Sequence, residues 1–222
     1  MFDINNYCCL DYTLAKNYLL SFMYPWQALH GLKEYIMILG ESLSKCEYNN
    51  PAKGVWIHKT ATVDVSAKIC PPCIIGERTQ VRHCAFIRGS ALIGKDCVVG
   101  NSTEIKNSIL FDKVQVPHYN YIGDSILGYK VHLGAGAVTS NVKSDKSEVC
   151  LNFEGDIIHT EMKKFGAIIG DESEIGCGSV LNPGTIIGRN TTVYPLTSVR
   201  GVRESNCIVK SSSVCVNKIP KS

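Results

Sequence analysis

A six-residue repeat of aliphatic side chains constrains the fold of this chain more than any other feature. Ten apolar residues recur at six-residue intervals from Ile57 to Phe111, and six more do so from Ile169 to Val199. Neither a helix nor a single strand produces this spacing, which is the period of hexapeptide β-helix repeats. Three hexapeptides would close one coil, so that equivalent residues of successive coils lie about 4.8 Å apart. The sequence therefore predicts a mainly β chain that forms a parallel β-helix of hexapeptide repeats.

The rest of the chain divides around this repeat. Residues 1–50 are predicted to be an N-terminal helical segment, because apolar residues recur there at helical spacing and Pro25 stands where a helix could start. The β-helix is assigned to residues 51–210 and a C-terminal tail to residues 211–222. Residues 140–164 do not follow the repeat, and a long excursion from a regular solenoid is usually a functional loop. The helical spacing is carried by Leu29, Leu32, Ile36, Leu39 and Leu43.

Composition narrows the class of protein. A net charge of +3 over 222 residues is too small to indicate a nucleic-acid partner. No apolar run is long enough for a membrane span, and the N-terminus lacks the pattern of a secretory signal. Eleven cysteines at irregular spacing favour reduced thiols over a disulfide framework. We expect a cytoplasmic protein without a membrane or nucleic-acid partner.

The six-residue repeat is interrupted around one histidine. Five residues instead of six separate Phe111 from Val116 and Ile122 from Leu127, so one residue is missing on each side of His118. Such deletions are expected to re-aim the wall of the β-helix locally, as a bulge re-aims a strand.

Ionisable side chains gather near this interruption. Arg88 and Lys106 are eighteen residues apart and should stack on one face, which is unfavourable unless an anion lies between or in front of them. A phosphate is the natural anion for a guanidinium. With the deletions allowed for, Tyr121 should stack above Glu104, and His118 between Asn101 and Ala135.

This group of residues suggests acyl transfer to an amine. A histidine can remove a proton from an amine as the amine attacks a thioester. The small residues Gly134, Ala135 and Gly136 would let an acyl donor approach the wall and would offer backbone N–H groups to a developing oxyanion.

The same residues carry a family resemblance. Residues 87–141 resemble the C-terminal acetyltransferase domain of the bifunctional N-acetylglucosamine-1-phosphate uridylyltransferase/glucosamine-1-phosphate acetyltransferase family. The matching stretches are G-N-S-T-E-I-K (100–106), H-Y-N-Y-I-G-D (118–124) and H-L-G-A-G-A-V-T-S-N (132–141). The whole chain looks like a standalone bacterial branch that is related to UDP-N-acetylglucosamine pyrophosphorylases. No Gly-rich nucleotide loop precedes the β-helix, so uridylyltransferase activity is not expected.

The resemblance implies a left-handed β-helix, a homotrimer with active sites between subunits, and acetyl transfer from acetyl-CoA to the amine of an amino-sugar 1-phosphate, with no metal required. His118 matches the general base of the family. The expected substrate-binding residues are Arg88, Lys106, Tyr121, Asn141, Glu104, His132 and Lys146. The expected cofactor-binding residues are Ala135, Cys177, Pro195 and Lys210.

Departures from the family pattern keep other functions open. His132 replaces a sugar-binding asparagine, Cys177 replaces a serine, and Tyr194 and Pro195 replace small residues along the expected CoA groove. One alternative is a non-catalytic sugar-phosphate-binding module that partners a separate nucleotidyltransferase. Another is a metal-dependent hydratase, which would need three histidines at a trimer interface. The histidines available for that site are His83, His118 and His132.

Overall fold

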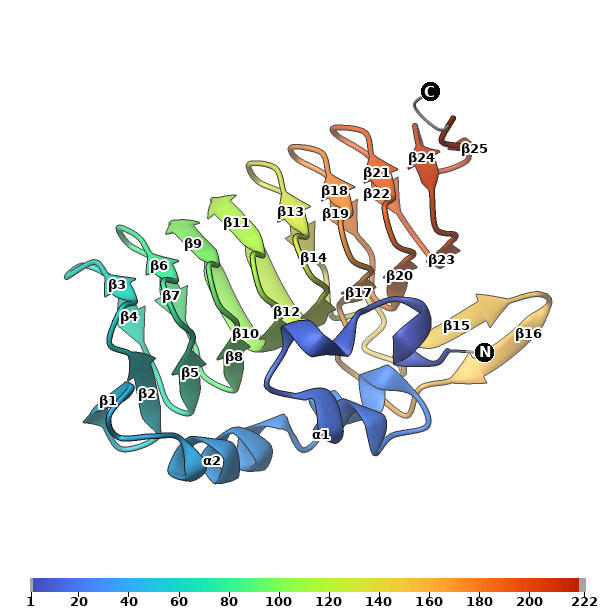
Figure 1. Ribbon diagram of the computed structural model, residues 1–222. Helices are drawn as coiled ribbons and strands as arrows, with labels where there is room; N and C mark the ends of the chain where they lie inside the picture. Colours follow the sequence, from blue (N-terminus) through green and yellow to red (C-terminus); the bar gives the residue numbers. More distant parts are fainter. Residues whose placement is uncertain (1, 220–222) are drawn as a thin grey trace.

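The computed structural model describes residues 2–219, and most of them wind into a parallel β-helix with helices packed along one side (Figure 1). Successive coils pair in register, for example Val81 with Val99, eighteen residues apart, and Ile105 with Ile122, seventeen apart. The fold class predicted from the six-residue repeat is confirmed. Among residues 2–219, no helix combines the length and the apolar character that crossing a membrane requires.

Each coil except the last contributes one strand to each of three faces. The covered face consists of β2 (Val55–His58), β5 (Cys73–Ile75), β8 (Ala91–Ile93), the second halves of β10 (Glu104–Leu110) and β12 (Tyr121–Leu127), β17 (Ala167–Ile169), β20 (Thr185–Ile187) and β23 (Val202–Arg203). The second face consists of β3 (Thr62–Val63), β6 (Gln80–Val81), β9 (Val98–Asn101), β11 (Gln115–His118), β13 (His132–Leu133), β18 (Glu174–Ile175), β21 (Thr192–Val193) and β24 (Cys207–Val209). The third face consists of β4 (Lys68–Ile69), β7 (Phe86–Ile87), the first halves of β10 and β12, β14 (Val138–Thr139), β19 (Val180–Leu181) and β22 (Ser198–Val199).

The interior of the β-helix is a column of aliphatic side chains. Almost all residues of the six-residue repeat lie in it, fully buried from Ile75 onward and partly buried in the first coil. Phe111 is the exception, because Leu110 takes the inward position, paired with Ile93 below and Leu127 above. Phe111 is buried outside the coil, against the N-terminal segment.

One of the two five-residue steps in the repeat lies at a different place from the one predicted. The five-residue steps run from Ile105 to Leu110 and from Ile122 to Leu127, so the step predicted between Phe111 and Val116 is wrong. Both short steps occur where β10 and β12 turn from the third face into the covered face as continuous seven-residue strands. A single residue at positive φ makes each turn, Asn107 at 47° and Asp124 at 49°. The shortened corners therefore flank Lys106 and Asp124 rather than His118.

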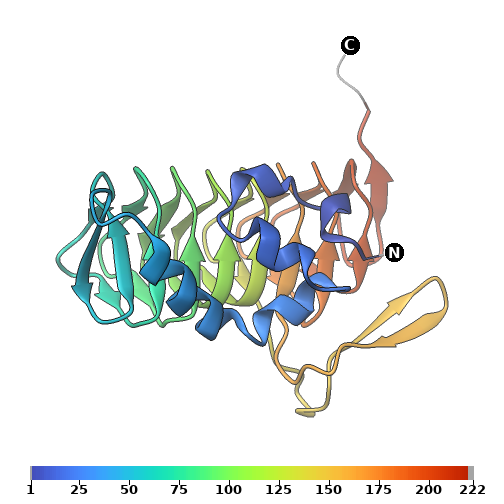
Figure 2. The same ribbon diagram turned by 60° about the horizontal axis from the view of Figure 1, so that its bottom comes forward.

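The N-terminal segment covers the outer side of one face. It contains the 3₁₀ turns η1 (Ile4–Asn6), η2 (Leu10–Tyr12) and η3 (Pro25–Leu29), and the helices α1 (Lys16–Leu20) and α2 (Leu32–Ser42). Pro25 opens the short η3, and a separate helix begins after Gly31, so the helical spacing from Leu29 to Leu43 does not form one helix. The segment lies along the covered face (Figure 2). The outward residues of that face are buried against it, which explains their apolar character: Trp56, Ile74, Leu92, Ile109, Ile126, Ile168 and Ile186.

Three antiparallel strand pairs complete the fold. β1 (Tyr48–Ala52) pairs antiparallel with β2, and β25 (Cys215–Asn217) pairs antiparallel with β24. Within residues 140–164, β15 (Cys150–Phe153) and β16 (Asp156–His159) form a hairpin that projects from the side of the β-helix (Figures 1 and 2). The segments predicted at 1–50 and 211–222 reach residues 1 and 220–222, which lie outside the described residues. All eleven cysteines are free thiols.

Candidate functional site

The predicted stack of cations is present on the third face. Ile87 pairs with Ile105, and the Arg88 N–H donates to the Ile105 carbonyl at 2.8 Å, so Arg88 and Lys106 are neighbours in successive coils. Tyr121 pairs directly with Glu104, as the spacing predicted. Four of the expected substrate-binding residues therefore lie on adjoining rungs of one face.

The charge that balances these cations comes from the protein itself. Arg88 Nη1 lies 2.7 Å from Glu104 Oε1, and Lys106 Nζ lies 3.3 Å from Asp124 Oδ2. The first pair is partly exposed, with 43% of the Arg88 side chain and 31% of the Glu104 side chain accessible to solvent. The second is largely buried, because only 5% of the Asp124 side chain is exposed. The predicted repulsion between Arg88 and Lys106 is thus balanced by Glu104 and by Asp124, and Asp124 was not among the residues expected from the sequence.

Asp124 is the centre of a hydrogen-bond network. Its Oδ1 accepts from Asn107 Nδ2 at 2.8 Å, and its Oδ2 accepts a short bond from Asn141 Nδ2 as well as contacting Lys106. Asn141 Nδ2 also donates to the Tyr121 hydroxyl at 3.3 Å. Residues from β10, β12 and the segment after β14 are thereby held together. A signal for Asp124 was present in the sequence, at the end of the H-Y-N-Y-I-G-D stretch.

Burial controls the protonation of the Tyr121 phenol. Desolvation raises the pKa of Tyr121 above its ordinary value, and the nearby Asp124 carboxylate raises it further. The phenol therefore stays protonated at neutral pH and can donate a hydrogen bond to a bound ligand. A side chain at Gly123 would disturb it, because an added Cβ would lie 2.6 Å from the Tyr121 hydroxyl oxygen. Similarly, the hydrogen bond that Arg88 donates to the Glu104 carboxylate raises the pKa of Arg88 and keeps the guanidinium charged.

His118 stands at the corner between the second and third faces, at the end of β11. It pairs with Asn101 below, and its carbonyl accepts from the Gly136 N–H at 3.0 Å above, which matches the predicted stacking. Its side chain is exposed. The corner is held by Asn120, whose side chain is buried and donates to the Gly134 carbonyl at 2.8 Å and the Ala137 carbonyl at 3.0 Å. Sequence reasoning missed Asn120.

The expected cofactor-binding residues continue the same corner. The Gly178 N–H donates to the Ala135 carbonyl and the Leu196 N–H to the Cys177 carbonyl, each at 2.8 Å, so Ala135, Cys177 and Pro195 follow His118 coil by coil. All three are exposed. Lys210 is exposed one coil further on. It lies next to Tyr194, because the Tyr194 N–H donates to the carbonyl of Val209, the residue before Lys210.

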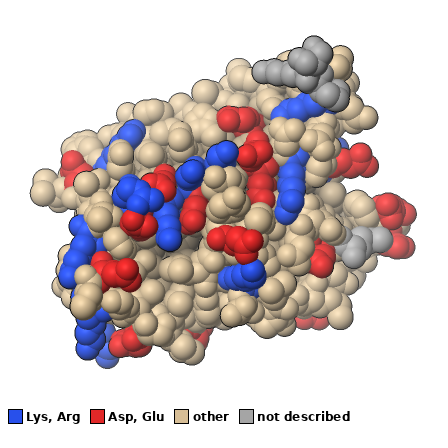
Figure 3. Space-filling model, in the orientation of Figure 1, with Lys and Arg blue, Asp and Glu red and all other residues tan. Residues whose placement is uncertain are grey.

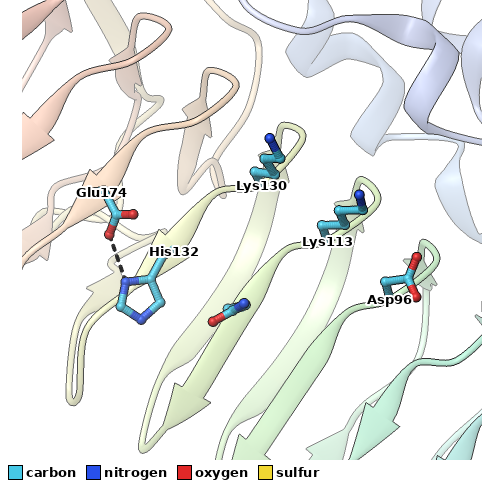
Figure 4. Close-up of a pocket in the computed structure, with 6 residues that line it drawn as sticks. Asp96, Lys113, Lys130, His132 and Glu174 are labelled. Carbon is cyan, nitrogen blue, oxygen red and sulfur yellow. Dashed lines mark hydrogen bonds and ion pairs between the residues drawn. The ribbon is translucent and has the colours of Figure 1, made fainter.

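Two of the expected residues make their hydrogen bonds or ion pairs outside this cluster. His132 faces outward from β13 on the second face, where its Nδ1 lies 2.8 Å from Glu174 Oε2. It lines a shallow pocket with Lys113, Lys130 and Asp96 (Figure 4). Lys146 is exposed in the 140–164 segment, where its N–H donates to the Lys143 carbonyl at 2.9 Å.

The distribution of surface charge and the positions of the histidines bear on a nucleic-acid partner and on a metal-dependent hydratase. On the face shown in Figure 3, basic and acidic side chains are interspersed and do not form a large patch of one sign. Within residues 2–219, His83, His118 and His132 do not converge into a three-ligand cluster in one chain.

Comparisons with known proteins point to one family. The model of the GlmU-like C-terminal hexapeptide family matches residues 85–154, which contain the cluster around Asp124 and the corner at His118. Over these residues the β-helix is similar to the GlmU-like C-terminal hexapeptide family. The bifunctional protein GlmU of Methanococcus maripaludis is 30% identical over 206 residues, which are 91% of this chain and 50% of that protein. The bifunctional sugar-1-phosphate nucleotidylyltransferase/acetyltransferase of Sulfurisphaera tokodaii is 28% identical over 81% of this chain and 46% of its own length.

The chain thus spans half or less of the length of these GlmU-like relatives. Among solved structures, the acetyltransferase domain of PglB from Neisseria gonorrhoeae, in complex with acetyl coenzyme A, is 21% identical over 68% of this chain and 52% of that one, with a TM-score of 0.34. At that TM-score the likeness adds nothing to the fold assignment, which rests on the strand pairing of this chain.

Proposed function

We propose that this chain transfers an acetyl group from acetyl-CoA to the amine of an amino-sugar 1-phosphate, with glucosamine 1-phosphate or a close analogue as acceptor. The observation that carries the proposal is one hydrogen-bonded network on the third face, one corner away from an exposed histidine. Arg88 and Lys106 supply cations for the sugar phosphate, and Tyr121 and Asn141 supply neutral donors. The relatives named above are called bifunctional GlmU and sugar-1-phosphate nucleotidylyltransferase/acetyltransferase, which supports this acceptor class.

In the proposed reaction, His118 acts as the general base. Its imidazole accepts a proton from the sugar amine as the nitrogen attacks the thioester carbonyl carbon, and that proton leaves with the CoA thiolate as the tetrahedral intermediate collapses. The Gly134 and Gly136 N–H groups already donate to neighbouring coils, to the Ile175 carbonyl at 2.7 Å and the His118 carbonyl at 3.0 Å. Of the three small residues, Ala135 is therefore the one whose N–H we assign to the oxyanion. The reaction as proposed needs no metal.

A trimer would complete the site. His132 lies apart from Lys106 within one chain, and we assign it to an active site shared with a neighbouring subunit. The exposed column of Ala135, Cys177 and Pro195 would hold acetyl-CoA, with Lys210 towards its far end. Sedimentation of the purified protein would measure the assembly, and a monomer with full activity would contradict this arrangement.

Release of the CoA thiol tests the proposal. The assay uses acetyl-CoA with glucosamine 1-phosphate or galactosamine 1-phosphate, and compares the wild type with His118→Ala and His83→Ala. His83 is the matched control because it is an exposed histidine on the same corner, two coils earlier, where its carbonyl accepts from the Ser102 N–H. We expect His118→Ala to lose about 100-fold or more in turnover, the usual contribution of a positioned base. His83→Ala should retain turnover.

The alternative of a non-catalytic sugar-phosphate-binding module has an observation in its favour. Tyr194 and Leu196 flank the corner column with 43% and 85% of their surface exposed, in the region where the resemblance places CoA. Absence of turnover with both sugars, in a protein that binds glucosamine 1-phosphate but not CoA in calorimetry, would favour that module over the transferase.

A further inference from the structure

A second chemically distinctive cluster lies away from the proposed site, on the projecting hairpin. Cys150 and His159 are directly paired across its two antiparallel strands, and Glu148 is two residues before Cys150. Each of the three offers one donor atom, and these atoms all lie within 4.8 Å of one another. A thiol, an imidazole and a carboxylate are the three side-chain types that bind zinc in proteins.

The two separations measured from His159 are close to those expected around a single metal position. His159 Nδ1 lies 3.8 Å from Cys150 Sγ and 3.5 Å from Glu148 Oε2, so one ring nitrogen faces both other donors. Zinc–sulfur and zinc–nitrogen or zinc–oxygen bonds of about 2.3 and 2.0–2.1 Å at a tetrahedral angle place sulfur about 3.6 Å and oxygen about 3.3 Å from that nitrogen. Both separations are within about 0.2 Å of these values, so a small shift of the side chains would bring all three donors to bonding distance of one ion.

The carboxylate is also oriented by the backbone. Glu148 Oε1 accepts a hydrogen bond from the Glu161 N–H at 2.6 Å, which leaves Oε2 directed at His159. Support of a metal ligand by an outer hydrogen bond is a general feature of metal sites. A cysteine and a histidine that merely share a surface do not have it.

Another cysteine–histidine pair in the chain shows the difference. Cys84 Sγ lies 3.2 Å from His83 Nε2, and the Asp64 carboxylate lies 3.8 Å from His83 Nδ1. The thiol and the carboxylate are therefore on opposite nitrogens of that ring, and no single ion can touch both as they stand. This pair provides a matched control on the same protein.

We propose that Glu148, Cys150 and His159 form a zinc site, with water as the fourth ligand. Binding would convert the Cys150 thiol to a thiolate, with its proton released to solvent. The metal would join the two strands of the hairpin to the segment that precedes them. The whole excursion leaves the β-helix after Asn141 and returns to it at Phe165, whose N–H donates to the Asn141 carbonyl at 3.0 Å. The site is separate from the proposed acetyl transfer and does not depend on it.

Cobalt substitution and thiol protection test the site. The full-length protein, treated with a chelator and then with cobalt(II), should show the visible bands of tetrahedral cobalt and a thiolate-to-cobalt charge-transfer band. In competition experiments, Cys150→Ser and His159→Gln should weaken zinc binding by about 100-fold or more, since even loss of an outer-shell partner costs about 10–100-fold. Cys84→Ser should bind zinc as tightly as the wild type.

Thiol protection uses the wild type alone, so it does not depend on whether a variant folds. Zinc should slow alkylation of Cys150, measured by mass spectrometry of the peptide, and should leave the exposed Cys46 and Cys84 unaffected. Equal alkylation of Cys150 with and without zinc would overturn the proposal. So would cobalt bands that persist in Cys150→Ser.

Discussion

Replacing Asp124 with asparagine separates charge from shape at the centre of the candidate site. The carboxylate receives three donors on two oxygens: Asn107 on Oδ1, and Asn141 and Lys106 on Oδ2. An asparagine has one acceptor oxygen, so at least one of these donors would face an NH₂ group. Water can relieve this conflict only in part, since 5% of the Asp124 side chain is exposed.

The size of the effect follows from the geometry. Two unit charges 3.3 Å apart attract by about 5 kcal/mol at an effective dielectric constant of 20. Burial of the carboxylate opposes this attraction by several kcal/mol. The net value should resemble that of other hydrogen bonds to charged groups, about 1.5–3 kcal/mol. For a chain of this size, Asp124→Asn should therefore lower the melting temperature by about 3–12 °C.

A double-mutant cycle with Lys106→Met isolates the pair. Urea unfolding of the four proteins at one fixed concentration gives the free energies of unfolding, because stability would vary with concentration in an oligomer. We expect the double variant to be less destabilised than the sum of the single variants by about 1–2 kcal/mol. Additivity within about 0.5 kcal/mol would refute the coupling between Lys106 and Asp124.

Three further predictions concern packing, pH and charge. Ile109→Ala, beneath the N-terminal segment, should lower the free energy of unfolding by about 2–5 kcal/mol in urea titrations. Ile38→Ala, on the exposed side of α2, should change it by less than about 0.5 kcal/mol. Equal losses in the two variants would contradict the packing of the segment. Burial raises the pKa of Tyr18 from 10.0 to about 12, so the folded state holds this proton more tightly and stability should fall as pH rises from about 10 through about 12. Denaturation across this range should show a shallower decline for Tyr18→Phe, and an unchanged slope would contradict the assignment. Glu104→Gln should tighten the binding of inorganic phosphate in calorimetry, because it frees Arg88, and weaker binding would show that Glu104 is not a competitor.

The six-residue repeat predicted the β-helix because each coil imposes the same demand on its inward residues. It placed Phe111 inside the coil because an aromatic residue satisfies an apolar pattern on either side of the wall. The structure puts Leu110 inside and Phe111 against the N-terminal segment. Periodicity alone cannot distinguish the two, since the outward residues of the covered face are also apolar wherever that segment covers them.

The eighteen-residue spacing predicted which site residues would be neighbours on successive coils. It did not predict which acidic side chain would form an ion pair with each cation. The spacing of Arg88 and Lys106 fixes their contact through strand register. Their counterions depend on which side chains the shortened corners turn towards them. The corner at Asp124 requires positive φ, and that backbone geometry is not visible in a hydrophobic pattern. Similarly, Asn120 acts through bonds to carbonyls of the next coil, which the type of residue alone does not reveal.

The internal pairing changes what a phosphate would encounter. Arg88 and Glu104 form a partly exposed pair that water and ions can reach, so exchange of Glu104 for a phosphate oxygen should cost little. Lys106 and Asp124 form a largely buried pair, and separating them would leave a desolvated carboxylate. A phosphate would therefore bind through Arg88. Lys106 would remain paired with Asp124 and would attract the phosphate electrostatically without a direct hydrogen bond. In the proposed reaction Arg88 would therefore determine the affinity for phosphate, whereas Asp124 would hold Lys106, Tyr121 and Asn141 in position for it.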